Sequence, residues 1–210
     1  MFINIIKGIL KGKSLARILM NLELKKYIIK GDVLDIGGGK NPSYYNFLQI
    51  DDNAEIVNVD LKSMNIDLEK DKLPANDNSV DCILIFNVLE HIYNYDFLMS
   101  EAKRVLKKEG VLLGFVPFLV NYHPDPHDYF RYTNEALEKI FFRAGFEKIE
   151  IKRIGRGPFA VNYNNINPSL PTFLNLFIFP FYYFLDYIFI KIRPKIIKRY
   201  PLGYVFYLTK

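Results

Sequence analysis

Apolar residues follow two different spacings along this chain. Short runs that are apolar at successive or alternate positions predict strands, and longer stretches that are apolar at every third or fourth position predict helices. From residue 32 onward the two kinds of segment alternate, which predicts an α/β fold with a mostly parallel sheet and helices on both faces. The predicted strands are 33–36, 56–60, 64–66, 81–86, 111–116, 148–154 and 203–208, and the predicted helices are 95–106 and 133–144.

Three residues mark expected ends of helices. Thr133 stands directly before an apolar-periodic stretch, as an N-terminal cap does. Gly110 and Gly145 follow such stretches, at the place where glycine commonly ends a helix. These positions predict the boundaries of the two central helices.

The first 30 residues predict one or two amphipathic helices outside the alternating pattern. Phe2, Ile5 and Ile9 share one face with lysines around it, and Ser14 is placed to cap a second helix. Lysines interrupt the apolar stretch and no small-residue cleavage site follows, so a signal peptide is not expected. The segment either covers the edge of the core or lies on a membrane surface.

The last third of the chain has a different composition. Residues 155–172 are rich in Gly, Asn and Pro and predict a loop, whereas residues 172–192 are almost continuously apolar. That length approaches a membrane span, but Asn175, Pro180 and Asp186 interrupt it. A helical hairpin, packed on the core or lying in the membrane interface, is therefore favoured over a span.

Length and cysteine content limit the domain organisation. A chain of 210 residues suits one domain with a substantial core. Its parts are an N-terminal helical segment (1–30), a core (31–154), a loop with an apolar helical insertion (155–200) and a final strand (201–210). The one cysteine, Cys82, lies in an apolar run and predicts a buried thiol. Without a disulfide or a Cys/His cluster, a cytoplasmic setting is favoured over a secreted one.

Charge is unevenly distributed along the chain. Residues 1–30 carry seven Lys or Arg and one acid, and residues 187–210 carry six Lys or Arg and no acid, so the segment between them is acidic. A nucleic-acid partner is not expected, because such proteins carry a basic face on the folded core. Basic ends beside apolar residues indicate peripheral contact with the inner face of an anionic membrane, or simply solvated terminal charge.

The segment VLDIGGG at residues 33–39 carries the strongest chemical signal. A strand that ends in glycines lets a nucleoside-containing cofactor approach the backbone closely. The dinucleotide spacing G-x-G-x-x-G is lost, and the carboxylate of Asp35 would repel a pyrophosphate but suits the cationic amino-acid end of S-adenosylmethionine. Asp60, at the end of the second predicted strand, could accept hydrogen bonds from both ribose hydroxyls.

These and later stretches resemble the class I S-adenosylmethionine-dependent methyltransferases, a family that includes small-molecule, quinone and sugar methyltransferases. The resemblance covers about residues 32–154 and implies a Rossmann-like sheet of seven strands whose last strand is antiparallel. It also implies S-adenosylmethionine as cofactor and S-adenosylhomocysteine as product. The matching stretches are VLDIGGGKNP (33–42), VD (59–60), DL (67–68), LP to SVD (73–81), VLEH (88–91) and LKKEGVL (106–112).

The resemblance implies roles for individual positions. The glycine turn would admit the cofactor, Asp35 would reach its ammonium group, and the end of the fourth strand would line its methionine side. The implied cofactor-binding residues are Asp35, Gly37, Gly38 and Gly39 at the turn, Asp60 and Leu61 at the ribose, Asp67 and Leu68 along the adenine, and Phe86 and Asn87 beside the methionine.

Residues 123–133 form the second informative stretch, with the sequence HPDPHDYFRYT. They follow the fifth predicted strand, at the sheet edge where open α/β proteins bind ligands. His127 could take a proton from the acceptor, and Arg131 could bind an acceptor phosphate or carboxylate. Alternatively, Asp128 and Arg131 pair to brace the loop. The candidate catalytic residues are His127, His123, Asp128, Arg131 and Tyr129.

Other histidine chemistry has less support from the sequence. His123 and His127 stand four positions apart in a proline-broken loop without an apparent third ligand, so no metal site is expected. His91 suits a packing or capping role as well as a site role.

The sequence therefore predicts methyl transfer to a hydroxyl or amine of a small or lipid-linked acceptor. The segment HDYFRYT (127–133) resembles segments of methyltransferases that are encoded with bacterial surface-polysaccharide genes, and this resemblance implies a sugar of a surface glycan as the leading candidate. Two alternatives stay open. One is a quinone or other isoprenoid-lipid methyltransferase, in which residues 172–192 guide the substrate. The other is a membrane-associated scaffold of the same fold without turnover.

Overall fold

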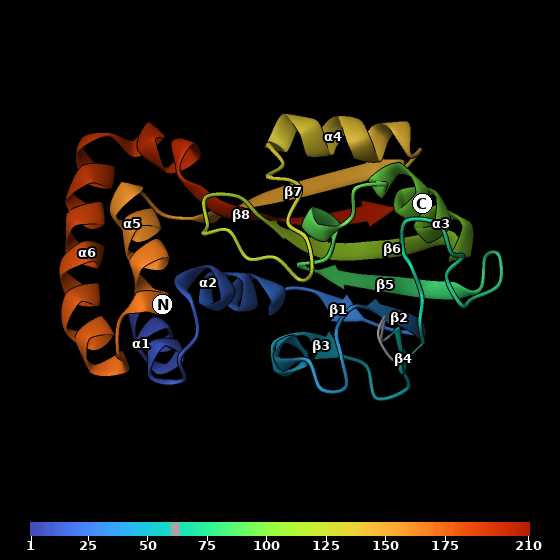
Figure 1. Cartoon of the computed structure of the whole chain (residues 1–210), viewed down its shortest axis with the longest axis horizontal. Helices are drawn as coiled ribbons and strands as arrows, with labels where there is room; N and C mark the ends of the chain where they lie inside the picture. The colour runs from blue at the N-terminus through green and yellow to red at the C-terminus, as the bar shows by residue number, and fades with distance from the viewer. Residues whose placement is uncertain (60–63) are drawn as a thin grey trace.

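The computed structural model describes residues 1–59 and 64–210, and its main sheet has six strands among them (Figure 1). All strands run parallel except β8, which lies antiparallel between β6 and β7. The mostly parallel sheet with an antiparallel last strand is thus confirmed. The order across the sheet is β4 (Glu55–Val59), β2 (Asp32–Ile36), β5 (Val80–Phe86), β6 (Leu106–Pro117), β8 (Pro201–Thr209) and β7 (Lys148–Gly155).

The strand count differs from the expected seven. The strand predicted at 64–66 is absent, because Met64 and Asn65 lie in a turn and Asn65 has a φ of 51°, which an extended strand does not allow. A separate two-stranded parallel sheet, β1 (Ile28–Ile29) with β3 (Gln49–Ile50), was not predicted.

Alternate side chains of the sheet point into two hydrophobic cores. Leu34 and Ile83 lie in the core that is covered by α3 (Tyr95–Val105) and α4 (Asn134–Arg143). Val33 and Leu84 point the other way, toward the helices α1 (Phe2–Leu10) and α2 (Leu15–Leu24). Helices therefore cover both faces, as the alternating pattern predicted.

Three of the four predicted capping signals mark a helix end correctly. The Ser14 hydroxyl accepts a hydrogen bond from the backbone N–H of Arg17, and the Thr133 hydroxyl accepts one from that of Ala136. Gly145, with a φ of 82°, follows α4 as expected. Gly110 does not end a helix, because α3 already ends at Val105 and the chain passes directly into β6.

The region predicted as a loop contains a helix. Residues 155–172 include α5 (Pro158–Ile166) and a short 3-10 helix, η3 (Asn167–Ser169). The Asp186 carboxylate, from the following helix, accepts hydrogen bonds from the N–H groups of Phe159 and Ala160 and so caps the start of α5. This cap comes from a residue distant in sequence, which local composition does not reveal.

The apolar segment forms one continuous helix, α6 (Thr172–Ile192), so the predicted hairpin is wrong. Asn175, Phe179 and Asp186 share the face that is buried against the protein. The Asn175 amide donates to the carbonyls of Asn167 and Leu170. The polar residues that interrupt the apolar run therefore attach α6 to its neighbours instead of breaking it.

The helices α1, α5 and α6 form a group at one end of the molecule, on the left in Figure 1. Phe2 of α1 packs on Phe179 and Tyr183 of α6, with ring centroids 5.7 and 5.1 Å away. Among the described residues, α6 is the helix long and apolar enough to cross a membrane. Its polar contacts with α5 make it a part of this domain.

Candidate active site

The chain leaves β2 through a turn that only glycine fits. Gly37 and Gly39 have φ values of 74° and 68°, and a Cβ at Gly37 would lie 2.6 Å from Cγ2 of Val88. A Cβ at Gly38 would lie 2.4 Å from both the Asp35 carboxylate and the Tyr44 hydroxyl. The turn thus brings its bare backbone to the carboxyl edge of the sheet, where a cofactor is expected to bind.

Asp35 is fully buried behind this turn and is held by two tyrosines. The Tyr44 hydroxyl donates to both carboxylate oxygens, at 2.6 and 2.7 Å, and the Tyr45 hydroxyl donates to Oδ2 at 2.6 Å. Burial raises the pKa of Asp35, and the hydrogen bonds from the tyrosines oppose that shift. Both tyrosines lie in the 3-10 helix η1 (Ser43–Asn46), and their role was missed because nothing in the sequence pairs them with Asp35.

The other predicted cofactor contacts fall in different places. Asp60 and Leu61 lie outside the described residues. Asp67 accepts a hydrogen bond from the N–H of Glu69 and pairs with Lys70, whereas Leu68 is buried in the core beneath this turn. The roles of Asp67 and Leu68 at the adenine stay predictions.

Phe86 ends β5 beside the glycine turn, and Asn87 follows it directly. The Phe86 ring is buried, 4.5 Å from that of Tyr44 between centroids, and so supports the tyrosine that holds Asp35. Asn87 has a φ of 54°, donates its N–H to the carbonyl of Phe115, and faces a pocket. The end of β5 therefore connects the cofactor turn to that pocket.

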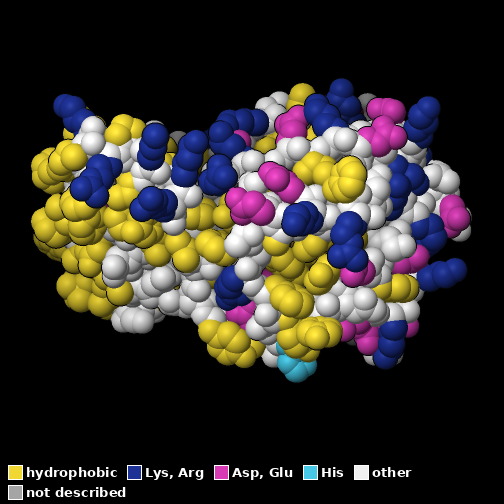
Figure 2. All heavy atoms as spheres, turned by 90° about the horizontal axis from the view of Figure 1, so that it is seen from above, with side chains coloured by type: hydrophobic (Ala, Val, Ile, Leu, Met, Phe, Trp, Pro, Cys, Tyr) yellow, Lys and Arg dark blue, Asp and Glu magenta, His cyan; other side chains and the backbone are white. Residues whose placement is uncertain are grey.

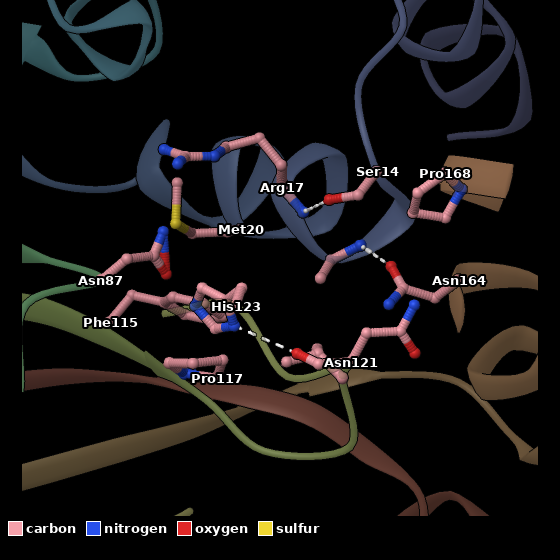
Figure 3. Close-up of a pocket in the computed structure, with 12 residues that line it drawn as sticks. Ser14, Arg17, Met20, Asn87, Phe115, Pro117, Asn121, His123, Asn164 and Pro168 are labelled. Atoms are coloured by element: carbon pink, nitrogen blue, oxygen red, sulfur yellow. Dashed lines mark hydrogen bonds between the residues drawn. The ribbon is translucent and has the colours of Figure 1, made fainter. Parts of the chain in front are cut away.

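The pocket has a volume of about 250 Å³ and lies at the carboxyl ends of β5 and β6 (Figure 3). Asn87, predicted to bind the cofactor, and His123, predicted to be catalytic, both line this pocket. Its opposite wall is α2, which carries Arg17, and α5, which carries Asn164. The N-terminal segment thus forms part of a site, a role that its amphipathic pattern did not reveal. The lining residues are Ser14, Ala16, Arg17, Met20, Asn87, Phe115, Pro117, Val120, Asn121, His123, Asn164 and Pro168.

Arg17 is the principal cation in this pocket. Its guanidinium forms no ion pair with any residue that the structure describes, although the Glu90 carboxylate and the Tyr44 hydroxyl act on it electrostatically. Burial lowers its pKa, and Tyr44 and Glu90 oppose that shift. An unpaired, partly buried arginine is suited to bind an anionic group of a ligand.

The loop after β6 is braced internally, as one of the two interpretations predicted. Asp128 and Arg131 form a bidentate ion pair, and Asp128 also accepts the N–H of His123 at 3.0 Å. Arg131 is thus committed to Asp128, and its contact with an acceptor stays a prediction. Tyr129 and His127 are exposed, with ring centroids 5.2 Å apart, and neither lines the pocket.

Glu90 lies fully buried behind His123, in the 3-10 helix η2 (Leu89–His91). Its Oε1 is 3.5 Å from Nε2 of His123 and 3.7 Å from Nε2 of His91. Neither carboxylate oxygen has a hydrogen-bond partner among residues 1–59 and 64–210. The carboxylate raises the pKa of the His123 imidazole. From the sequence, Glu90 was named only within the stretch VLEH (88–91) that matches the family, and no role was assigned to this acid.

Comparison with known proteins agrees with this geometry. Residues 34–114 match the model of a methyltransferase domain family. An uncharacterized protein of Methanocaldococcus jannaschii is 35% identical over 169 residues, 75% of this chain and 68% of the relative. The ubiquinone/menaquinone biosynthesis C-methyltransferase UbiE of Francisella tularensis is 24% identical over 66% of this chain and 76% of its own length.

The fold also matches solved structures. One is a Thermotoga maritima protein named as a SAM-dependent methyltransferase and possible histamine N-methyltransferase. It superposes with a TM-score of 0.56 at 15% identity, over 93% of this chain and 91% of its own. The chain belongs to the class I S-adenosylmethionine-dependent methyltransferases.

S-adenosylmethionine is accordingly the methyl donor of this methyltransferase. The turn at Gly37–Gly39 and Asn87 lie at the edge of the sheet where the resemblance to this family places the cofactor. The glycine backbone fits a closely approaching cofactor, whereas the Asp35 carboxylate lies buried behind the turn and is held by Tyr44 and Tyr45, so its contact with the ammonium group stays a prediction. The chemistry that the cofactor supplies is an electrophilic methyl group. The protein has to hold the acceptor in line with it.

Proposed function

We propose that this methyltransferase transfers the methyl group to a hydroxyl or amine of an acceptor whose reacting end occupies the pocket between Asn87 and His123. The observation that carries this proposal is the position of the pocket. Its wall begins at Asn87, directly after the strand that adjoins the glycine turn, and ends at Arg17 and His123. An acceptor there would lie next to the methionine end of the cofactor, as an in-line displacement requires.

The polar half of the lining residues supports an acceptor that is polar and carries a negative charge. Three amide side chains, those of Asn87, Asn121 and Asn164, line the pocket together with Arg17. Amides both donate and accept hydrogen bonds, which suits hydroxyl groups, and the guanidinium suits a carboxylate or phosphate. A sugar that carries an anionic group has both, which supports our expectation of a glycan acceptor.

The size of the pocket supports a partly enclosed acceptor. Pockets that enclose whole ligands usually measure about 300–1,000 Å³, and this one measures about 250 Å³. The reacting group would therefore lie inside while the rest of the acceptor extends outward. A lipid-linked acceptor has this shape, with a polar head and a tail that stays at a membrane.

The outer face of α6 suits contact with such a membrane. A stripe of aromatic residues along this helix is exposed, with Phe177 at 81%. Figure 2 shows hydrophobic side chains gathered at this end of the molecule with Lys and Arg beside them. The basic residues lie in and around η4 (Pro194–Arg199), where they would attract anionic lipid headgroups. The stripe consists of Phe173, Phe177, Phe181, Phe184 and Tyr187.

We therefore place the protein at the cytoplasmic face of a membrane, in peripheral contact through α6. Sedimentation with vesicles of phosphatidylcholine and phosphatidylglycerol tests this placement. The double variant Phe177→Glu/Phe181→Glu should lose binding, whereas Phe142→Glu should keep it, because Phe142 is 74% exposed on the distant helix α4. Equal sedimentation of both variants would contradict the placement.

The pocket is tested by separating cofactor binding from methyl transfer. Wild-type protein should bind S-adenosylmethionine in a calorimetric titration and transfer labelled methyl groups to a glycolipid extract. Arg17→Ala should keep the binding and lose most of the transfer, and Arg143→Ala, an exposed arginine on α4, should change neither. If Arg17→Ala transfers methyl groups normally, the pocket is not the acceptor site.

A quinone acceptor is the second candidate, favoured by the similarity to UbiE, which is named as a C-methyltransferase of quinone biosynthesis. The exposed aromatic face of α6 would suit an isoprenoid lipid equally well. The amide-rich pocket favours the glycan acceptor instead. Label recovered on carbon of a quinone precursor, with none in glycolipid, would support the second candidate.

A further inference from the structure

The carboxylate of Glu90 has an unusual environment for a buried acid. Its exposed fraction is 0%, and both of its oxygens lack a hydrogen-bond partner in the part of the chain that the structure describes. An ionised group in such a position destabilises the folded state unless it is paired or bound to a cation. Its nearest ionisable neighbours are the imidazoles of His91 and His123, and the Arg17 guanidinium acts on it from a greater distance.

Two histidines turn the same ring atom toward this carboxylate. Nε2 of His91 is 3.7 Å from Oε1 of Glu90, Nε2 of His123 is 3.5 Å away, and the three ligand atoms lie within 4.8 Å of one another. Ligands about 2.1 Å from one ion lie about 3.0–3.4 Å apart at octahedral or tetrahedral angles. If the three ligand atoms move closer together, by between a fraction of an ångström and slightly more than one ångström, all three can therefore bind the same ion.

The opposite nitrogen of each ring determines which tautomer is present. Nδ1 of His91 bonds to the carbonyl of His127, and Nδ1 of His123 bonds to the carbonyl of Asn121 at 3.1 Å. A carbonyl only accepts, so Nδ1 of His91 carries hydrogen and Nε2 of the neutral ring presents a lone pair. Nδ1 of His123 also has a guanidinium nitrogen of Arg131 at 3.4 Å, which only donates, and the shorter contact with the Asn121 carbonyl favours the same tautomer for this ring. Histidines that bind metals are usually oriented in this way by an outer hydrogen bond.

The loop after β6 is attached so that His123 stays against Glu90. The Glu90 carbonyl accepts the N–H of Tyr129 at 2.9 Å, and the Asp128 carboxylate accepts the N–H of His123. The Asp128–Arg131 ion pair stabilises this arrangement from the other side. The cluster is therefore built from two segments that are distant in sequence and joined by backbone hydrogen bonds.

We propose that Glu90, His91 and His123 bind a divalent first-row transition-metal ion. Two imidazoles and one carboxylate on one side of an ion leave the remaining coordination positions open. His123 lines the acceptor pocket and is 42% exposed at its side chain, so the open positions face that pocket. Binding the ion would also neutralise the charge of the buried Glu90.

The ion supplies the activation of the acceptor, a role that rests on the function proposed above. A hydroxyl bound to it has a lowered pKa and releases its proton to solvent. The resulting oxygen attacks the methyl carbon of S-adenosylmethionine and forms the C–O bond. The C–S bond breaks, and its electron pair stays on sulfur to give S-adenosylhomocysteine.

Metal binding is tested first, without any acceptor. The protein is first stripped of bound metal with a chelator and is then titrated with Zn²⁺ in a calorimeter. Binding of Co²⁺ is followed by visible absorption. Wild type should bind one ion per chain, with a Co²⁺ spectrum that indicates nitrogen ligands. Glu90→Gln and His91→Ala should each weaken Zn²⁺ binding by about 100-fold or more, since loss of an outer partner alone costs about 10–100-fold.

His127→Ala is the matched control, because this exposed histidine lies in the same loop and its ring is outside the cluster. It should bind Zn²⁺ as wild type does. The metal site would be overturned if the wild-type protein bound no ion. It would also be overturned if Glu90→Gln and His91→Ala bound Zn²⁺ as the wild-type protein does. The metal site would also be overturned if chelation left methyl transfer undiminished but Glu90→Gln abolished it. That result would instead indicate proton transfer between Glu90 and His123. Ion binding without methyl transfer would support the site and count against the proposed acceptor only.

Discussion

The hydroxyl of Tyr44 provides a direct measure of what holds Asp35 in the folded protein. Tyr44→Phe removes one oxygen and keeps the ring, so the packing of that ring on Phe86 at 4.5 Å is retained. The lost hydroxyl donates to Oδ1 at 2.6 Å and to Oδ2 at 2.7 Å, and Tyr45 reaches only Oδ2. Oδ1 of Asp35 would therefore lose its donor inside the protein.

The size of the effect follows from burial. Tyr44 is 4% exposed and Asp35 is 0% exposed, so water does not replace the hydroxyl without rearrangement. A hydrogen bond to a charged group contributes about 1.5–3 kcal/mol to folding. For a domain of this size each kcal/mol changes the melting temperature by about 2–4 °C, which predicts a decrease of about 3–12 °C.

Urea denaturation followed by circular dichroism measures this change in the free energy of unfolding. Tyr122→Phe is the matched control, because Tyr122 is 73% exposed, and it should change stability by less than about 0.5 kcal/mol. If Tyr44→Phe unfolds with the same free energy as Tyr122→Phe, the tyrosines do not stabilise a charged Asp35, and the reasoning is refuted.

Three further changes test other buried groups. Burial raises the pKa of Asp35, so the favourable contribution of this group to stability is present below the unfolded pKa of 3.8 and is lost as pH rises through the folded pKa. Asp35→Asn should remove this fall in stability and should weaken the binding of S-adenosylmethionine measured by calorimetry. An unchanged dependence of stability on pH would contradict this reasoning. Asp186→Ala leaves the N–H groups of Phe159 and Ala160 unpaired and should lower the free energy of unfolding by about 1–3 kcal/mol in urea, a value below 0.5 kcal/mol being the contrary result. Burial raises the pKa of Cys82 to about 12, so its thiol should react with a disulfide reagent at pH 8 only after urea is added, and fast reaction of the native protein would argue against this burial.

Elements with local signals were predicted correctly. The strands at β2, β5 and β6 and the caps at Ser14 and Thr133 depend on residues a few positions apart, and each was readable from spacing alone. The helix α5 was missed, because its start is capped by Asp186 from another helix. The same acid made α6 look interrupted, although it forms the buried contact between the two helices.

The candidate site also has a part that the sequence predicted and a part that it did not. The glycine turn and Asp35 lie within one short segment, so their chemistry was predictable before the fold was known. Arg17, which lines the pocket from α2, lies far along the chain from His123, and no sequence pattern joins them. The expected absence of a metal site was based on His123 and His127, the pair that is close in sequence. The structure instead brings His123 to Glu90 and His91.

The sequence by itself determined the alternation of strands and helices, the glycine turn and the family, because periodicity, capping and steric freedom of the backbone depend on near neighbours. Only the tertiary structure decided where the acceptor pocket lies, which residues hold Asp35, and that the carboxylate of Glu90 is buried between two imidazoles. Those features depend on contacts between distant segments, and the energy of a buried charge is set by everything that surrounds it in space.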